Sequence, residues 1–261
     1  MSTMTEMTDE LTGAITLPWH WEWVPAASAG DEVRRLWSDH LVELFEDWTG
    51  PGLAAVRAAL PERDRAEFPF TPELLGRYSA QWLVERADSL ISGQRLAWGA
   101  AFVGGRPRWA PVPVAVEFRA PLADDPMYLM DIVGARPRRE AGRERERERE
   151  PVVDYVTTPF GDGLRVLGLG RSDEGMAFGR LDAAMRLDWP PTEDREAVRM
   201  DVLLTTRIVD ISLLAVIGPG VEQLMQRIAN EHEGARIVRT QEAPEAYEAP
   251  ESHPAHEGAV T

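Results

Sequence analysis

The sequence predicts an α+β fold: a mainly antiparallel sheet of about six to eight strands, covered on one face by N-terminal helices and one C-terminal helix. Two observations carry this prediction. Helical periodicity occurs at the two ends of residues 12–230, and the stretch between them consists of short runs of alternating polarity separated by turns. Strands joined by such turns pair in antiparallel fashion, and terminal helices then cover the sheet. We therefore expect a single α+β domain over residues 12–230.

The N-terminal part of this domain is predicted to contain a short strand and three helices. Residues 19–23 alternate tryptophan with His and Glu, which is the period of a strand. Residues 31–48 place their large apolar side chains on one helical face, and the glycines and proline of 50–52 are expected to end that helix. A shorter helix is predicted at 53–60. The third, 71–92, begins with threonine and proline, a favoured N-cap and first helical residue.

The middle of the chain is predicted to be strand, with the prolines at 111 and 113 limiting the start of the second of these strands to a sheet edge or an irregular stretch. The expected strands are 95–103, 108–119, 127–133, 152–157, 164–169, 176–189 and 198–207.

The C-terminal helix is expected to start at Gly218 and Pro219. Its apolar side chains follow the i, i+3, i+4, i+7 pattern of one helical face. They are Val221, Leu224, Met225 and Ile228. Asp210 is predicted to cap a helical turn that precedes this helix.

Three segments are predicted to lie outside the packed core. Residues 1–11 are expected to form a flexible lead, and residues 231–261 an acidic, disordered tail, since they carry too few large apolar side chains to offset the entropy of ordering. The charged stretch 136–150 contains a strict Arg-Glu alternation that suits neither a core-facing strand nor a well-supported helix. It is expected to be a flexible, solvated loop.

Composition excludes several kinds of catalytic site. All 28 basic side chains are arginine, and the chain has no cysteine. A thiolate nucleophile, a thiolate metal site, a Schiff-base lysine and a phosphate-loop lysine are therefore excluded. Three of the five histidines fall in the 231–261 segment. The sequence thus assigns no catalytic residue, no metal site and no cofactor.

The formal net charge of −16 makes nucleic acid and anionic lipid surfaces poor partners, because both are negatively charged. No positively charged, apolar signal segment opens the chain, and the longest apolar run, 208–221, is interrupted and shorter than a bilayer span. We therefore expect a cytoplasmic protein without membrane insertion. The use of arginine, alanine and glycine is typical of a GC-rich coding sequence, hence of a bacterial source.

The segment Trp19-His20-Trp21-Glu22-Trp23 is the densest group of large side chains and is the candidate binding site. If the three tryptophans are exposed, they offer a stacking surface for a sugar, a base or a proline-rich peptide, with His20 and Glu22 as a proton-transfer or metal pair. The alternative is that the tryptophans pack under the long N-terminal helix while His20 and Glu22 face water.

His40 is the other candidate binding residue. Acidic residues lie near it on the predicted helix 31–48, so that a base or a metal ligand is conceivable. A solvated histidine on an acidic helical surface is the alternative, because no second histidine lies three or four residues away to complete a helical ligand pair.

These observations favour a non-catalytic protein that binds another protein, as an adaptor, escort or assembly subunit, through a sheet edge or an apolar groove between helix and sheet. A homo-oligomer is a further possibility. The alternative hypothesis is a small-ligand binder or hydrolase-like enzyme, with a pocket between the helical layer and the sheet.

Overall fold

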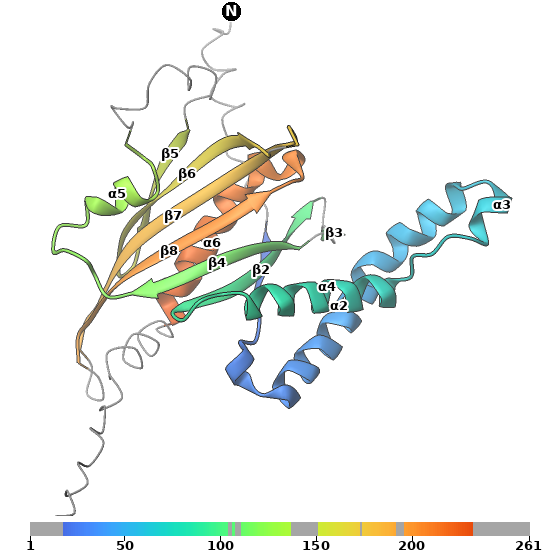
Figure 1. Cartoon of the computed structure of the whole chain (residues 1–261), viewed down its shortest axis with the longest axis horizontal. Helices are drawn as coiled ribbons and strands as arrows, with labels where there is room; N and C mark the ends of the chain where they lie inside the picture. Colours follow the sequence, from blue (N-terminus) through green and yellow to red (C-terminus); the bar gives the residue numbers. More distant parts are fainter. Residues whose placement is uncertain are drawn as a thin grey trace, which may run out of the picture.

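A computed structural model describes residues 18–103, 106–107, 111–136, 151–172, 174–191 and 196–231. The predicted flexible segments 1–11, 136–150 and 231–261 lie outside this description, apart from their single residues 136 and 231. Within it the α+β class is confirmed (Figure 1). The helices are α2 (Asp31–Ala59), α3 (Glu62–Arg65), α4 (Pro72–Asp88), α5 (Tyr128–Ile132) and α6 (Leu214–Glu231), with 3-10 turns η1 (Ala27–Ala29) and η3 (Ile211–Leu213).

One antiparallel sheet organises the molecule, and its strands follow the order β1-β2-β4-β8-β7-β6-β5, with the short β3 paired to β2. The strands are β1 (Trp19–Trp23), β2 (Gln94–Val103), β3 (Arg106–Pro107), β4 (Val112–Arg119), β5 (Val152–Thr158), β6 (Gly161–Arg171), β7 (Ala177–Trp189) and β8 (Val198–Ile208). Sequence neighbours form most of the pairs. The pairing of β4 with β8, far apart in the chain, joins the two halves of the sheet.

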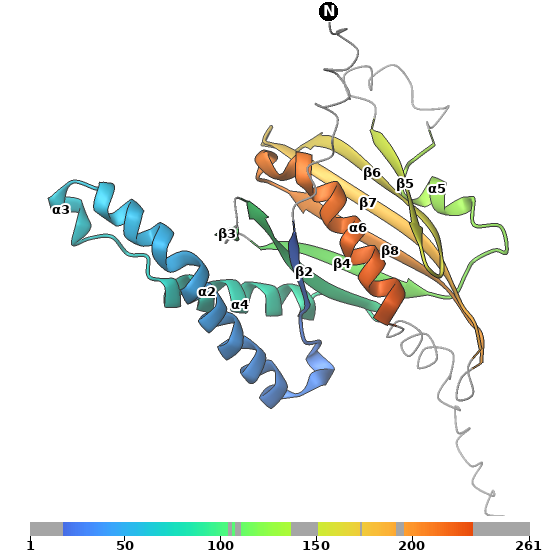
Figure 2. The same cartoon turned by 180° about the vertical axis from the view of Figure 1, so that it is seen from behind.

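Helix α6 covers one face of the sheet and builds the main core (Figure 2). The predicted apolar face of the helix is confirmed, since Val221, Leu224, Met225 and Ile228 are all buried. Alternate residues of β7, from Leu181 to Trp189, are buried beneath it. Apolar side chains recur with a period of 3.6 in α6 and of 2 in β7, so each element has one apolar face. These two faces pack against each other.

The opposite face is covered in two places, which corrects the expectation that all helices lie on one side. Helices α2 and α4 form a helical hairpin that leaves the sheet at its β1–β2 end; we call residues 31–88 the helical arm (Figure 1). Leu96, Trp98 and Ala100 of β2 face this arm, whereas Ala97 and Ala101 face α6. The short helix α5 packs on the same face, over β6 and β7. Because strand side chains alternate, β2 contributes to both layers.

The long helix α2 corrects the predicted break at residues 50–52. It runs without interruption from Asp31 to Ala59 with Pro51 inside, so that the two helices expected at 31–48 and 53–60 are one. A proline within a helix removes one hydrogen bond but keeps a helical φ. The buried Phe45 and Thr49 hold the preceding turn, with the Thr49 hydroxyl donating to the Phe45 carbonyl at 2.7 Å.

One further prediction was wrong. Residues 127–133, expected as a strand, form the one-and-a-half-turn helix α5. The strand whose start the prolines were expected to limit to a sheet edge or an irregular stretch is β4, which lies between β2 and β8. Its ladder with β8 starts only at Ala115, so Pro113 precedes the pairing that a missing N–H would disrupt. The predicted caps at Thr71 and Asp210 are confirmed, since both side chains accept backbone N–H groups.

Candidate functional site

The three tryptophans of β1 face α6, not the long N-terminal helix under which the sequence interpretation placed them. The Trp21 indole Nε1 donates to the Gly220 carbonyl at 3.0 Å, and the Trp19 and Trp21 rings stack with centroids 5.2 Å apart. Trp23 Nε1 donates to Glu231 Oε2 at 3.0 Å. The strand therefore docks onto α6 through its tryptophans, and core packing, not an exposed stacking surface, accounts for Trp19 and Trp21.

His20 and Glu22 consequently point toward the helical arm and not to bulk water. The His20 ring lies 5.5 Å from that of Trp48 and 5.2 Å from that of Trp98, measured between centroids. His20 Nε2 lies 3.6 Å from Glu22 Oε2, and the two side chains are 33% and 24% exposed. The structure brings this pair together as the sequence suggested, but against aromatic rings. Neither residue lines the two cavities described below.

His40 lies apart from this pair, exposed on the surface of α2. Its neighbour Asp39 forms an ion pair with Arg35 at 2.9 Å. Within the part of the chain that the structure describes, no group of three or more His, Asp or Glu side chains is arranged to hold a metal ion. His40 and His20 therefore do not combine into one site.

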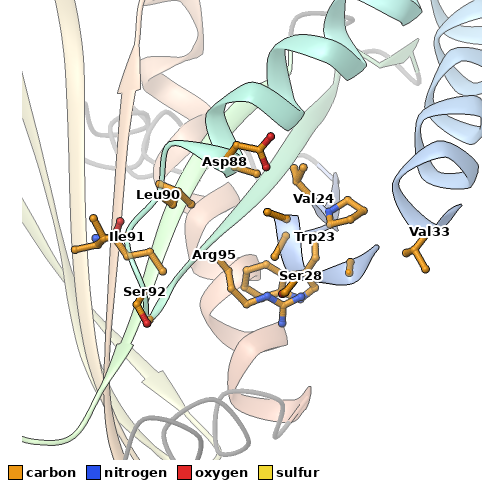
Figure 3. Close-up of a pocket in the computed structure, with 16 residues that line it drawn as sticks. Trp23, Val24, Ser28, Val33, Asp88, Leu90, Ile91, Ser92 and Arg95 are labelled. Carbon is orange, nitrogen blue, oxygen red and sulfur yellow. The ribbon is translucent and has the colours of Figure 1, made fainter. Parts of the chain in front are cut away.

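One candidate site is an open cavity of about 800 Å³ where the helical arm meets the sheet, which we call the apolar groove. Its walls are residues 23–29, at the end of β1 and through η1, Val33 of α2, and most of residues 87–95, which connect α4 to β2. Figure 3 shows Leu90 and Ile91 on one side and Val33 on the other, with Trp23 between them. The side chain of Ile91 is 68% exposed and that of Val33 51%, so this rim presents apolar surface to solvent.

Among the residues that the structure describes, two ionisable side chains line the apolar groove, Arg95 and Asp88. The Arg95 guanidinium lies 4.4 Å from the centroid of the Trp23 ring, a cation–π stack that Figure 3 displays. Asp88 pairs with Arg34 of α2 at 2.7 Å and ties the base of the arm together. The hydroxyls in the lining belong to Ser28 and Ser92, and the described lining residues include no histidine.

A smaller cavity of about 440 Å³ lies at the far end of the helical arm. It is formed where residues 50–58 of α2 approach the loop that carries Phe68 and Phe70, and those two rings pack edge to face with centroids 5.6 Å apart. Arg65 donates from Nε and Nη2 to the carbonyls of Leu60 and Ala58 at 2.9 and 2.8 Å. These bonds close the turn between the helices, so the cavity belongs to the architecture of the arm tip.

A buried ionic network lies under α5, and the sequence interpretation did not anticipate it. Arg186 of β7 and Asp201 of β8 are cross-strand neighbours, with Arg186 Nε donating to Asp201 Oδ1 at 2.8 Å and Nη2 to Oδ2 at 3.3 Å. The Tyr128 hydroxyl donates to Asp201 and accepts from Arg186 Nη2 at 3.1 Å. Arg186 Nη1 also reaches the Asp124 carbonyl at 2.6 Å. The network thus fastens α5 and the loop before it to the sheet.

Burial shifts both charged partners of this network toward their neutral forms. It raises the pKa of Asp201 to about 6, and the nearby Arg119 opposes that rise. Burial likewise lowers the pKa of Arg186. The alternation of the sequence indicates which residues of β7 and β8 share the polar face of the sheet. Only packing against another element, here α5, buries that face.

No protein-family model matches the chain, and no curated protein or solved structure is similar enough to match it. Among the described residues, no helix combines the length and apolar character needed to cross a bilayer.

Proposed function

We propose that this chain is a non-catalytic cytoplasmic protein that holds a segment of another protein in the apolar groove, as an adaptor, escort or assembly subunit. One observation carries the proposal: a groove of about 800 Å³ with an exposed apolar rim at Ile91 and Val33. Large exposed apolar surfaces rimmed by polar residues mark interaction sites in soluble proteins. The volume of the groove also lies within the range of roughly 300–1,000 Å³ typical of small-ligand pockets, so openness and not volume separates the two candidate occupants.

The shape of the groove favours a chain segment over a small metabolite. Sites for small ligands enclose most of the ligand surface, whereas this groove is open to solvent. An apolar side chain of a bound segment would enter between Trp23 and Leu90, and its backbone would remain near the polar groups of the rim. The alternative, a small-ligand binder that uses the same cavity, is an outcome of the experiment below.

The experiment places a photo-crosslinking residue at position 91 of the full chain, in the cells that express it, with position 122 as the matched control. Ile91 and Leu122 are 68% and 71% exposed, so both positions tolerate substitution, and Leu122 lies outside the groove. We expect a protein crosslinked at 91 and not at 122. Its crosslinked segment is then synthesised and titrated into the purified chain by calorimetry.

The matched variants Ile91→Asp and Leu122→Asp decide the result. We expect Ile91→Asp to weaken binding of that segment at least tenfold, because a charge enters an apolar contact, and Leu122→Asp to leave it unchanged. Equal crosslinking at both positions, or a segment that binds Ile91→Asp as tightly as the unaltered chain, contradicts the proposal. A co-purifying small molecule displaced by Ile91→Asp instead supports the small-ligand alternative.

A further inference from the structure

The end of α6 lies at the wall of the apolar groove. Trp23, which lines the groove, donates its indole N–H to Glu231, the last residue of α6. Arg227 of the same helix donates to the Glu231 carboxylate and to the Trp21 carbonyl of β1. These contacts fix the point from which residues 232–261 leave the described part of the chain.

The chain beyond that point carries a segment with the chemistry that the groove requires. Ile237 and Val238 are the only adjacent pair of large aliphatic residues in 232–261. They are flanked by Arg236 and Arg239, the only arginines in that stretch. Ile237 is six residues past Glu231, and an extended chain covers at most about 3.5 Å per residue, so Ile237 reaches up to about 20 Å from the helix end.

We propose that the segment 236–239, Arg-Ile-Val-Arg, occupies the apolar groove of its own chain until a partner segment displaces it. This inference rests on the proposed function, in which the apolar groove is the binding site. It also limits the disorder expected for 231–261 to the residues on either side of 236–239. The Ile237 and Val238 side chains take the place between Trp23, Leu90 and Ile91.

Charge complementarity supports this occupant. Asp31 and Glu32 are exposed at the start of α2, directly after the η1 turn that lines the groove, and Asp88 lies on the groove wall, where it pairs with Arg34. Figure 3 shows Asp88 well separated from Arg95, which is engaged in the stack on Trp23. The flanking arginines therefore meet an acidic rim on a chain whose formal net charge is −16.

Occupancy of the groove by residues 236–239 regulates the binding of a partner segment and determines which residues that segment must carry. A tethered segment acts at a high effective concentration, so a partner must compete with it and binds with a reduced apparent affinity. A competent partner segment then shares the same pattern, two aliphatic side chains flanked by basic residues. The groove would otherwise expose its apolar rim permanently, a liability for a soluble protein.

The absence of cysteine permits a direct test in the full chain. The pair Ile91→Cys and Val238→Cys is compared with the matched pair Leu122→Cys and Val238→Cys under mild oxidation at dilute protein concentration. We expect the first pair to form an intramolecular disulfide at least ten times faster than the second, because docking holds the two Cα atoms within bridging range. Equal rates overturn the inference.

A second experiment separates this inference from the proposed function. In the full chain, Ile237→Asp with Val238→Asp should tighten the binding of the crosslinked partner segment at least fivefold, whereas Ile91→Asp weakens it. If Ile91→Asp weakens binding and the tail variant changes nothing, self-occupancy is overturned and the proposed function stands. If neither variant alters binding, both fail.

Discussion

Helix α6 and the helical arm pack on opposite faces of β2, yet they build cores of different kinds. The α6 side is one continuous apolar layer from β1 to β5, and the indole N–H groups of Trp21 and Trp189 donate to carbonyls of the helix. The arm side is smaller. Among the described residues, it buries the indole nitrogens of Trp37 and Trp98 without a hydrogen-bond partner, whereas on the α6 side, with its larger core, Trp19 is the one tryptophan whose buried indole nitrogen lacks a partner. Since an unpaired buried polar atom costs free energy, we infer that α6 holds the fold and that the arm is the more readily opened unit.

The comparison also explains where the apolar groove lies. It opens at the base of the arm, where the smaller core ends and the turn from α4 to β2 leaves Leu90 and Ile91 partly uncovered. Binding surfaces are drawn from the less stable parts of a protein, because a rigid, filled layer offers no place for a partner. The molecule is thus divided into a stable α6 layer and a separable arm.

The largest expected effect is the loss of unfolding free energy when a fully buried leucine is truncated, and it should differ between α6 and the arm. Leu224→Ala in α6 should lower the free energy of unfolding by about 3–5 kcal/mol, and Leu83→Ala in α4 by about 2–3 kcal/mol. Chemical denaturation measures both. Hydrogen exchange should show the Leu83→Ala effect confined to residues 31–88, whereas Leu224→Ala accelerates exchange throughout the sheet. Sheet-wide acceleration in Leu83→Ala would contradict the division.

Substitutions at two glycines test the same difference between the α6 side and the arm. A Cβ at Gly99 would come within 2.4 Å of the Trp21 ring on the α6 side, and one at Gly76 within 2.8 Å of the Val42 backbone, where α4 crosses α2. Gly99→Ala should therefore destabilise the whole molecule by about 2 kcal/mol, and Gly76→Ala should loosen the arm by a similar amount. Gly52→Ala, with nothing within 4 Å, should stabilise α2 by about 0.5–1 kcal/mol. Thermal unfolding of the three variants checks these signs.

The face opposite α6 should also carry a pH dependence. Burial raises the pKa of Asp201 from 3.8 to about 6, so the folded chain holds this proton more tightly than the unfolded chain. The resulting stabilisation is fully present below about pH 4 and is lost as the pH rises through 6. Relative to Asp201→Asn, the unaltered chain should therefore lose on the order of 1–2 kcal/mol of stability between pH 4 and 7.

Denaturant titrations across this pH range measure the difference. Asp39→Asn, a change at an exposed carboxylate of α2, is the control and should leave the pH dependence of the unaltered chain in place. Parallel pH profiles for the unaltered chain and Asp201→Asn would show that Asp201 does not titrate in this window.

The smallest expected effect is again confined to the arm. The Thr71 hydroxyl accepts the Leu74 N–H at 3.1 Å and caps α4. Thr71→Ala should cost about 1 kcal/mol, and Thr71→Ser, which keeps the hydroxyl, much less. Hydrogen exchange of residues 72–80 measures the loss, and a faster exchange in β7 or β8 would argue against a separable arm.

The sequence by itself determined the elements whose signals are local. The period of 3.6 in residues 221–228, the alternation in 181–189 and the cap at Thr71 all predicted what forms there, because each depends on neighbours within a few residues. The pair His20 and Glu22 was likewise found from its shared strand face. None of these patterns indicates which layer of the structure an element will contact.

Only the tertiary structure decided the rest. Alternation placed the tryptophans of β1 on one face, but whether that face meets the arm or α6 depends on pairings between residues about two hundred positions apart, such as Trp21 with Gly220. The same holds for the helix through Pro51, which neighbouring packing sustains, and for the Arg186–Asp201 pair, which α5 covers. The apolar groove has no local signature, because its walls come from three separate segments that meet only when the arm folds back onto β2.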